Sequence, residues 1–115
     1  MHLLAVVDDL FFTVKIQDAA KRAGFSLTVV NNADRAVELA ADTLVIVDLN
    51  TKSLDPVALI KRLKEKHATV MAFVPHVQVE LKQRALDAGA DSVSARSVFD
   101  RDLAAILRQH AERIG

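Results

Sequence analysis

The sequence predicts an α/β domain built around a parallel sheet of five strands, and two observations support this fold class. Short apolar runs alternate with longer helical patterns along all 115 residues. Strict alternation of strand and helix is typical of a parallel sheet with helices on both faces. Hydrophobic residues make up 51% of the chain, and no linker, repeat or low-complexity segment interrupts it. The chain therefore suits one packed domain over residues 1–115.

The first half of the chain contains predicted strands at residues 3–7, 26–30 and 43–47. Between the first two strands, one face of a helix is apolar and comprises Phe12, Ile16, Ala19, Ala20 and Ala23. We expect Gly24 to end this helix, because glycine readily adopts the left-handed conformation found after many helices. We expect Asn32 to cap a short helix over residues 33–41, because its side chain can accept hydrogen bonds from free N–H groups.

The second half of the chain begins with a strong helix start at Asp55 and Pro56. A capping carboxylate followed by proline suits the first turn, where N–H groups lack partners within the helix. The apolar stripe of that helix is Leu59, Ile60 and Leu63. The next predicted elements are a strand at 69–74, a helix over about 78–88 that ends at Gly89, and a strand at 92–95. We expect Ser97 or Asp100 to cap a last helix that runs to about residue 113.

Charge, cysteine content and hydropathy narrow the classes of function. Lys plus Arg and Asp plus Glu are both 15, so the chain lacks the basic excess that is typical of nucleic-acid binding. Without cysteine, the chain can form neither disulfides nor thiolate metal sites. No apolar run approaches the roughly 18 residues of a membrane-spanning helix. We therefore expect a soluble cytoplasmic protein, and no output domain, because the chain ends just after its fifth helix.

Acidic side chains follow two strands that are expected to be neighbours. Five strand–helix units match the flavodoxin-like strand order 2-1-3-4-5, in which ligands bind between the carboxyl ends of strands 1 and 3. Asp8 and Asp9 follow the first strand, and Asp48 follows the third in the stretch LVIVDLN. The pattern therefore predicts that these carboxylates meet at one end of the sheet.

This acidic cluster suits a particular chemistry. Neighbouring carboxylates raise each other's pKa unless a cation lies among them. Carboxylates, a backbone carbonyl and water molecules are the ligands that Mg²⁺ prefers. A carboxylate beside Mg²⁺ can attack a phosphoryl group, because the metal neutralises charge on the transferred oxygens. A purely structural alternative is that Asp8 and Asp9 cap the first helix and that Asp48 merely ends a strand.

With these residues the sequence resembles the response-regulator receiver (CheY-like) domain of two-component signalling, over essentially its whole length. The stretches that carry the resemblance are VVDD at residues 6–9, VIVDLN at 45–50 and ALDAGAD at 85–91. The resemblance implies that Asp48 accepts a phosphoryl group from a histidine kinase or a phosphotransfer protein. It also implies that Asp8, Asp9 and the backbone carbonyl of Asn50 bind Mg²⁺.

Other positions depart from the pattern of that family. Val74 stands where receivers usually carry Ser or Thr, and Val93 stands where they carry an aromatic residue. Arg96 replaces the usual Lys and presents a wider, planar group. His76 follows the fourth strand near the expected pocket and could contact an anion or accept phosphate. These departures predict an atypical receiver or a pseudo-receiver.

Three functional hypotheses follow from this comparison. The leading one is a stand-alone atypical receiver, not an enzyme. It signals through a downstream protein partner or through self-association, by way of its fourth helix, fifth strand and fifth helix. The second is a constitutive interaction scaffold that is never phosphorylated, in which Arg96 pairs with Asp48. The third is a small aspartate-nucleophile phosphatase, suggested by VDLNT at residues 47–51. It is the weakest, because Asn50 cannot serve as a general acid and the chain leaves no room for the further motifs of such enzymes.

Overall fold

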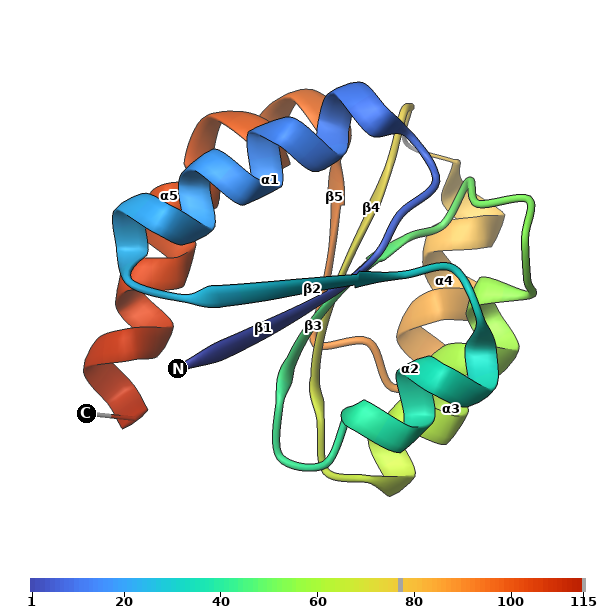
Figure 1. Ribbon diagram of the computed structural model, residues 1–115. Helices are drawn as coiled ribbons and strands as arrows, with labels where there is room; N and C mark the ends of the chain where they lie inside the picture. Colours follow the sequence, from blue (N-terminus) through green and yellow to red (C-terminus); the bar gives the residue numbers. More distant parts are fainter. Residues whose placement is uncertain (77, 115) are drawn as a thin grey trace.

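Five parallel strands form the central sheet in the computed structural model, which describes residues 1–76 and 78–114 (Figure 1). The strands are β1 (His2–Val6), β2 (Ser26–Val30), β3 (Leu44–Asp48), β4 (Thr69–Val74) and β5 (Ser92–Ala95). They lie in the order β2-β1-β3-β4-β5, which confirms the predicted topology. Strands β1 and β3 each lie within one residue of the predicted bounds, and Asp48 is the last residue of β3 instead of following it.

Helices cover both faces of the sheet. One face carries α1 (Leu10–Ala23) and α5 (Arg96–Ile114), and the other carries α2 (Ala33–Leu39), α3 (Pro56–Glu65) and α4 (Val79–Asp87) (Figure 1). Side chains of β3 alternate between the two faces: Leu44 and Ile46 pack on the α1–α5 side, and Val45 and Val47 on the other. Because β3 is covered on both sides, it reads as a continuous apolar run. None of the described helices is long and apolar enough to cross a membrane.

The core on the α1–α5 face contains a cluster of three aromatic rings. The Phe12 and Phe73 centroids are 4.6 Å apart, and those of Phe73 and Phe99 are 5.2 Å apart. These rings come from α1, β4 and α5, so they join both helices to the sheet. Phe73 is the register partner of Asp48 across β3 and β4. The cluster therefore lies next to the end of β3.

Helix ends follow the predicted capping pattern except at two places. Asn32 and Asp55 accept backbone N–H groups at the starts of α2 and α3, and Gly24 ends α1 with a φ of 81°. Helix α2 ends at Leu39, two residues before the predicted end. Helix α5 begins at Arg96, directly after β5, so neither Ser97 nor Asp100 caps it. Both residues lie within the first turns of α5, because no loop separates strand and helix there.

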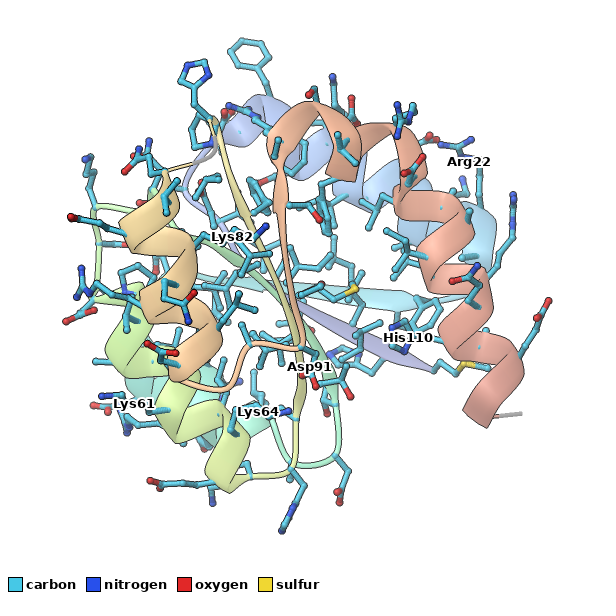
Figure 2. All side chains as sticks on the ribbon, turned by 180° about the vertical axis from the view of Figure 1, so that it is seen from behind. Arg22, Lys61, Lys64, Lys82, Asp91 and His110 are labelled. Carbon is cyan, nitrogen blue, oxygen red and sulfur yellow. The ribbon has the colours of Figure 1, made fainter. Side chains whose placement is uncertain are left out.

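An ion pair joins α3 to the turn that precedes β5. Lys64 Nζ donates to Asp91 Oδ2 at 2.8 Å, and the two side chains approach each other in Figure 2. The same carboxylate oxygen accepts the Val70 N–H at 2.7 Å. The stem of Lys64 also covers Gly89, where a Cβ atom would lie 2.8 Å from Lys64 Cγ and φ is 110°. Gly89 is therefore needed both for its backbone conformation and for this close packing.

Candidate functional site

The carboxyl ends of β1 and β3 bring Asp8, Asp9 and Asp48 together, as predicted. Strands β1 and β3 are paired up to Val6 and Val47, so the residues that follow lie at the same edge of the sheet. Asp48 lies close enough to Asp8 and Asp9 for both negative charges to raise its pKa. The convergence of these side chains follows from the strand order, because parallel neighbours end side by side.

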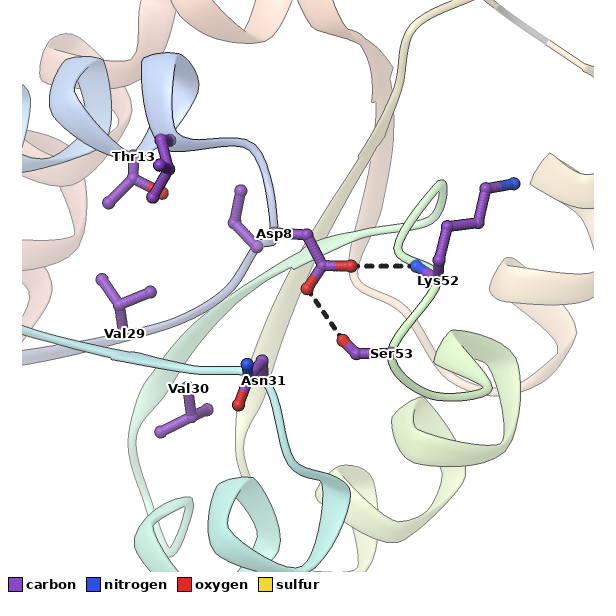
Figure 3. Close-up of a pocket in the computed structure, with 9 residues that line it drawn as sticks. Asp8, Thr13, Val29, Val30, Asn31, Lys52 and Ser53 are labelled. Atoms are coloured by element: carbon purple, nitrogen blue, oxygen red, sulfur yellow. Dashed lines mark hydrogen bonds between the residues drawn. The ribbon is translucent and has the colours of Figure 1, made fainter.

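Asp8 is held by the loop that follows β3. Its carboxylate accepts hydrogen bonds from the Thr51 hydroxyl at 2.6 Å, the Lys52 N–H at 2.9 Å and the Ser53 hydroxyl at 2.8 Å. The bonds from Lys52 and Ser53 are drawn in Figure 3. The pKa of Asp8 is lowered, most of all by the hydrogen bond from Thr51. The sequence alone did not predict these partners, although Thr51 and Ser53 in the loop that follows the acidic end of β3 are a signal that could have identified them.

Asp9 caps α1 and also forms an ion pair. Its Oδ1 atom accepts the Phe11 N–H at 2.9 Å and the Phe12 N–H at 3.2 Å. Its Oδ2 atom accepts a hydrogen bond from the Arg96 guanidinium. The Phe12 N–H and then Arg96 lower the pKa of Asp9. The capping role, which was the structural alternative for Asp9, is confirmed.

Arg96 reaches Asp9 from the first turn of α5. Its guanidinium carbon lies 4.8 Å from the centroid of the Phe12 ring, within the range of a cation–π contact. The pairing of Arg96 with Asp48 that the scaffold hypothesis predicted is therefore wrong. Asp9 caps the turn of α1 that carries Phe12, and the guanidinium lies on the Phe12 ring. Arg96 therefore pairs with the carboxylate of Asp9 instead of that of Asp48.

Asp48 is the buried carboxylate of the three. It is 8% exposed, and its Oδ1 atom accepts the Asn50 N–H at 2.8 Å. Burial raises its pKa, while the Asn50 N–H and the charge of Arg96 partly offset that effect. An ionised carboxylate with little hydrogen bonding is costly in such a place. Asp48 is thus the least compensated charge of the site.

The remaining predicted positions lie at the end of β4, on β5 and in the turn after β4. Val74 is 1% exposed and packs into the core on the α2–α4 face. Val93 is partly buried on β5 and packs against the same core. His76 lies exposed in the turn after β4. Among the described residues, no hydrogen bond or ion pair joins His76 to the three carboxylates.

An open groove of about 610 Å³ lies beside Asp8 (Figure 3). It is lined by Val7, Asp8, Leu10, Thr13, Val29, Val30, Asn31, Lys52 and Ser53. Near it, the first turns of α1 carry the exposed apolar side chains Leu10, Phe11 and Val14, of which Phe11 is 86% exposed. The residues next to Asp9 therefore form an apolar surface beside the acidic site, which the sequence analysis did not predict.

The oxygen atoms at this site match Mg²⁺ in type. Two carboxylates and a backbone carbonyl are hard donors of the kind this ion prefers. Each carboxylate oxygen has two lone pairs, so Asp8 and Asp9 retain acceptor capacity beyond their present bonds. In the described part of the chain, no three His, Cys, Asp or Glu side chains are arranged to hold a metal ion. The donor types fit the ion, although Arg96 already donates a hydrogen bond to one of these oxygens, Asp9 Oδ2.

Known proteins with a similar sequence are distant relatives of this chain. No protein-family model matches the sequence. The transcriptional regulatory protein CpxR of Escherichia coli K12 is 26% identical over 109 residues, which are 92% of this chain and 47% of that protein. The chain thus spans about half the length of this curated relative.

Solved structures resemble the whole fold. A CheY-like response regulator receiver domain protein from Methanospirillum hungatei has a TM-score of 0.81 and 16% identity, covering 97% of this chain and 94% of that one. A response regulator from Burkholderia pseudomallei, solved with a phosphorylated aspartic acid, a calcium ion and citrate, has a TM-score of 0.78 and 21% identity. That match covers 98% of this chain and 69% of the other. The chain therefore has the fold of a response-regulator receiver (CheY-like) domain.

Proposed function

We propose that this receiver-fold chain acts in phosphorelay signalling and accepts a phosphoryl group on Asp48 from a histidine kinase or a phosphotransfer protein. The observation that carries the proposal is the position of Asp48. It is a buried carboxylate at the end of β3, with Asp8 and Asp9 beside it and a raised pKa. Perturbed carboxylates at the switch point of a doubly wound sheet are typical of functional sites.

The transfer requires Asp48 in its ionised form. One carboxylate oxygen attacks phosphorus, an O–P bond forms, and the N–P bond to the donor histidine breaks with its electron pair returning to the ring. The Asn50 N–H holds Oδ1, which leaves Oδ2 as the attacking atom. Asp8, Asp9 and the Asn50 carbonyl would hold Mg²⁺, which would neutralise charge on the phosphoryl oxygens.

The output of this proposed receiver is a protein contact. Val74 offers no hydroxyl to the phosphoryl group, and one missing hydrogen bond to a charged group weakens coupling by about 1.5–3 kcal/mol. The expected contact face comprises α4, β5 and α5, where Val79, Leu86 and Val98 are exposed apolar side chains. We expect no catalytic turnover from the chain itself.

The second candidate function is a constitutive interaction scaffold that is never phosphorylated. Two observations favour it. Asp9 and Arg96 already neutralise each other, and hydroxyl and amide donors already satisfy Asp8. In this alternative the pocket needs neither a cation nor a phosphoryl group to remain stable.

Acetyl phosphate with Mg²⁺ separates the two candidates. The receiver proposal predicts a mass increase of one phosphoryl group, which Asp48→Asn abolishes and the exposed control Asp18→Asn on α1 leaves intact. Because the chain has no tryptophan, amide NMR replaces fluorescence as the readout of conformation. Shifts that extend to α4 and β5 would support signalling. The absence of any adduct would contradict the proposal in favour of the scaffold, and sustained hydrolysis of a phosphomonoester would indicate an enzyme instead.

A further inference from the structure

We propose that Arg96 competes with a divalent cation for Asp9, so that cation binding at the site is coupled to release of α5 from the start of α1. This inference rests on the proposed function in one respect, because it takes Asp8 and Asp9 as the cation ligands. It adds a resident competitor, the guanidinium of Arg96, which already pairs with one of those ligands.

Asp9 can offer a cation one carboxylate oxygen without losing its role as the cap of α1. Its Oδ1 atom is committed to the Phe11 and Phe12 N–H groups, which would lose their capping partner if it turned away. Its Oδ2 atom is the one that Arg96 holds. A cation that uses Asp9 without unravelling the first turn of α1 must therefore meet Oδ2. Two positive centres on one oxygen repel each other, so Arg96 has to withdraw.

Arg96 can withdraw without unfolding its surroundings. Its side chain is 35% exposed and lies at the edge of the pocket, so solvent is available to a displaced guanidinium. Its charge also acts on Asp48, whose pKa it lowers, so the guanidinium interacts with the pocket beyond Asp9.

Withdrawal of Arg96 would change contacts in the core and at the start of α5. The guanidinium lies on the Phe12 ring, which belongs to the cluster with Phe73 and Phe99. Arg96 is also the first residue of α5, so its bond to Asp9 ties the starts of α1 and α5 together. A second tie, from Lys15 to Asp100 at 2.9 Å, joins the same two helices one turn further on. It does not involve the pocket.

The affinity for Mg²⁺ of the unphosphorylated protein tests this competition directly. We expect Arg96→Gln to bind Mg²⁺ about tenfold more tightly than the wild type in an amide NMR titration, because a charged hydrogen bond no longer opposes the cation. The matched control is Lys15→Gln, which removes one positive charge from the same helix pair without touching Asp9. We expect its affinity to stay within about twofold of the wild type, because exposed charges are screened. Arg96→Lys, which keeps the charge, should fall between the two.

A second readout follows Arg96 itself. In the wild type, Mg²⁺ should shift the Arg96 Nε signal and the ring signals of Phe12 and Phe99, and in Arg96→Gln the ring shifts should be lost. Equal affinities for wild type and Arg96→Gln would overturn the inference, as would an equal gain in Lys15→Gln. Absence of Mg²⁺ binding in every variant would overturn it as well. The acetyl phosphate test remains separate, since an adduct on Asp48 would uphold the phosphoacceptor whatever the titration shows.

Discussion

Asp8 and Asp9 lie beside Asp48 in one pocket, yet the protein surrounds the two kinds of carboxylate in opposite ways. The side-chain carboxylates of Asp8 and Asp9 each accept three hydrogen bonds from described residues, and the pKa of each is lowered. The carboxylate of Asp48 accepts one from the described residues, donated by the Asn50 N–H, and burial raises its pKa. The first two charges are therefore stabilised by the fold itself, whereas the third is maintained at a cost. A costly, buried charge among well-compensated neighbours is where a reaction is expected.

Removing the Asp9 side chain should have the largest effect on stability. We expect Asp9→Ala to lower the free energy of unfolding by about 1–2 kcal/mol, because α1 loses its cap and Arg96 loses its partner. Asp9→Asn should have a smaller effect, since an amide still caps the helix and the partly exposed ion pair contributes about 0–1 kcal/mol. Urea unfolding measures both values. Equal losses in the two variants would contradict this expectation, because they would show that the cap itself contributes nothing to stability.

Neutralising Asp48 should have the opposite sign. We expect Asp48→Asn to raise the free energy of unfolding by about 1 kcal/mol, because an amide of the same shape avoids the cost of a buried charge. The exposed pair of Arg101 and Asp102 offers a control, because solvent screens this pair and Asp102→Asn should leave the free energy of unfolding nearly unchanged. Thermal unfolding of the two variants makes the comparison. A loss of stability in Asp48→Asn would contradict the view that its charge is poorly compensated.

The pH dependence should reveal the same contrast through a smaller effect. The folded-state pKa of Asp48 lies above 3.8, so the cost of its charge is present at neutral pH and disappears as the pH falls through that pKa toward 3.8. The folded-state pKa values of Asp8 and Asp9 lie below 3.8, so their stabilisation is present above 3.8 and is lost only as the pH falls below it.

Urea unfolding of wild type and Asp48→Asn over a pH series measures this contrast. The stability gap between the two proteins should narrow as the pH falls from neutral toward 3.8. Below 3.8 both proteins should lose stability together, because they share Asp8 and Asp9. A gap that stays constant over the whole range would show that Asp48 titrates in the same way in the folded and unfolded chains.

Most of the fold and the centre of the site could be predicted from the sequence. Strand and helix periods are local properties, and caps such as Asn32 and Asp55 act within a few residues, so the elements were found nearly at their bounds. The meeting of Asp8, Asp9 and Asp48 followed from the strand order alone. By contrast, the start of α5 was misplaced, because Ser97 and Asp100 have the side chains of caps while the chain passes straight from strand to helix.

What the sequence determined by itself is the sheet, its order and the delivery of Asp48 to the end of β3 between its acidic neighbours. Only the tertiary structure decided which groups pair with each carboxylate. Arg96 pairs with Asp9 instead of Asp48, and the loop after β3 closes on Asp8. The physical reason is that apolar periodicity specifies which face of an element is buried. The partner of a long charged side chain depends instead on distances between segments as remote in sequence as α1 and α5.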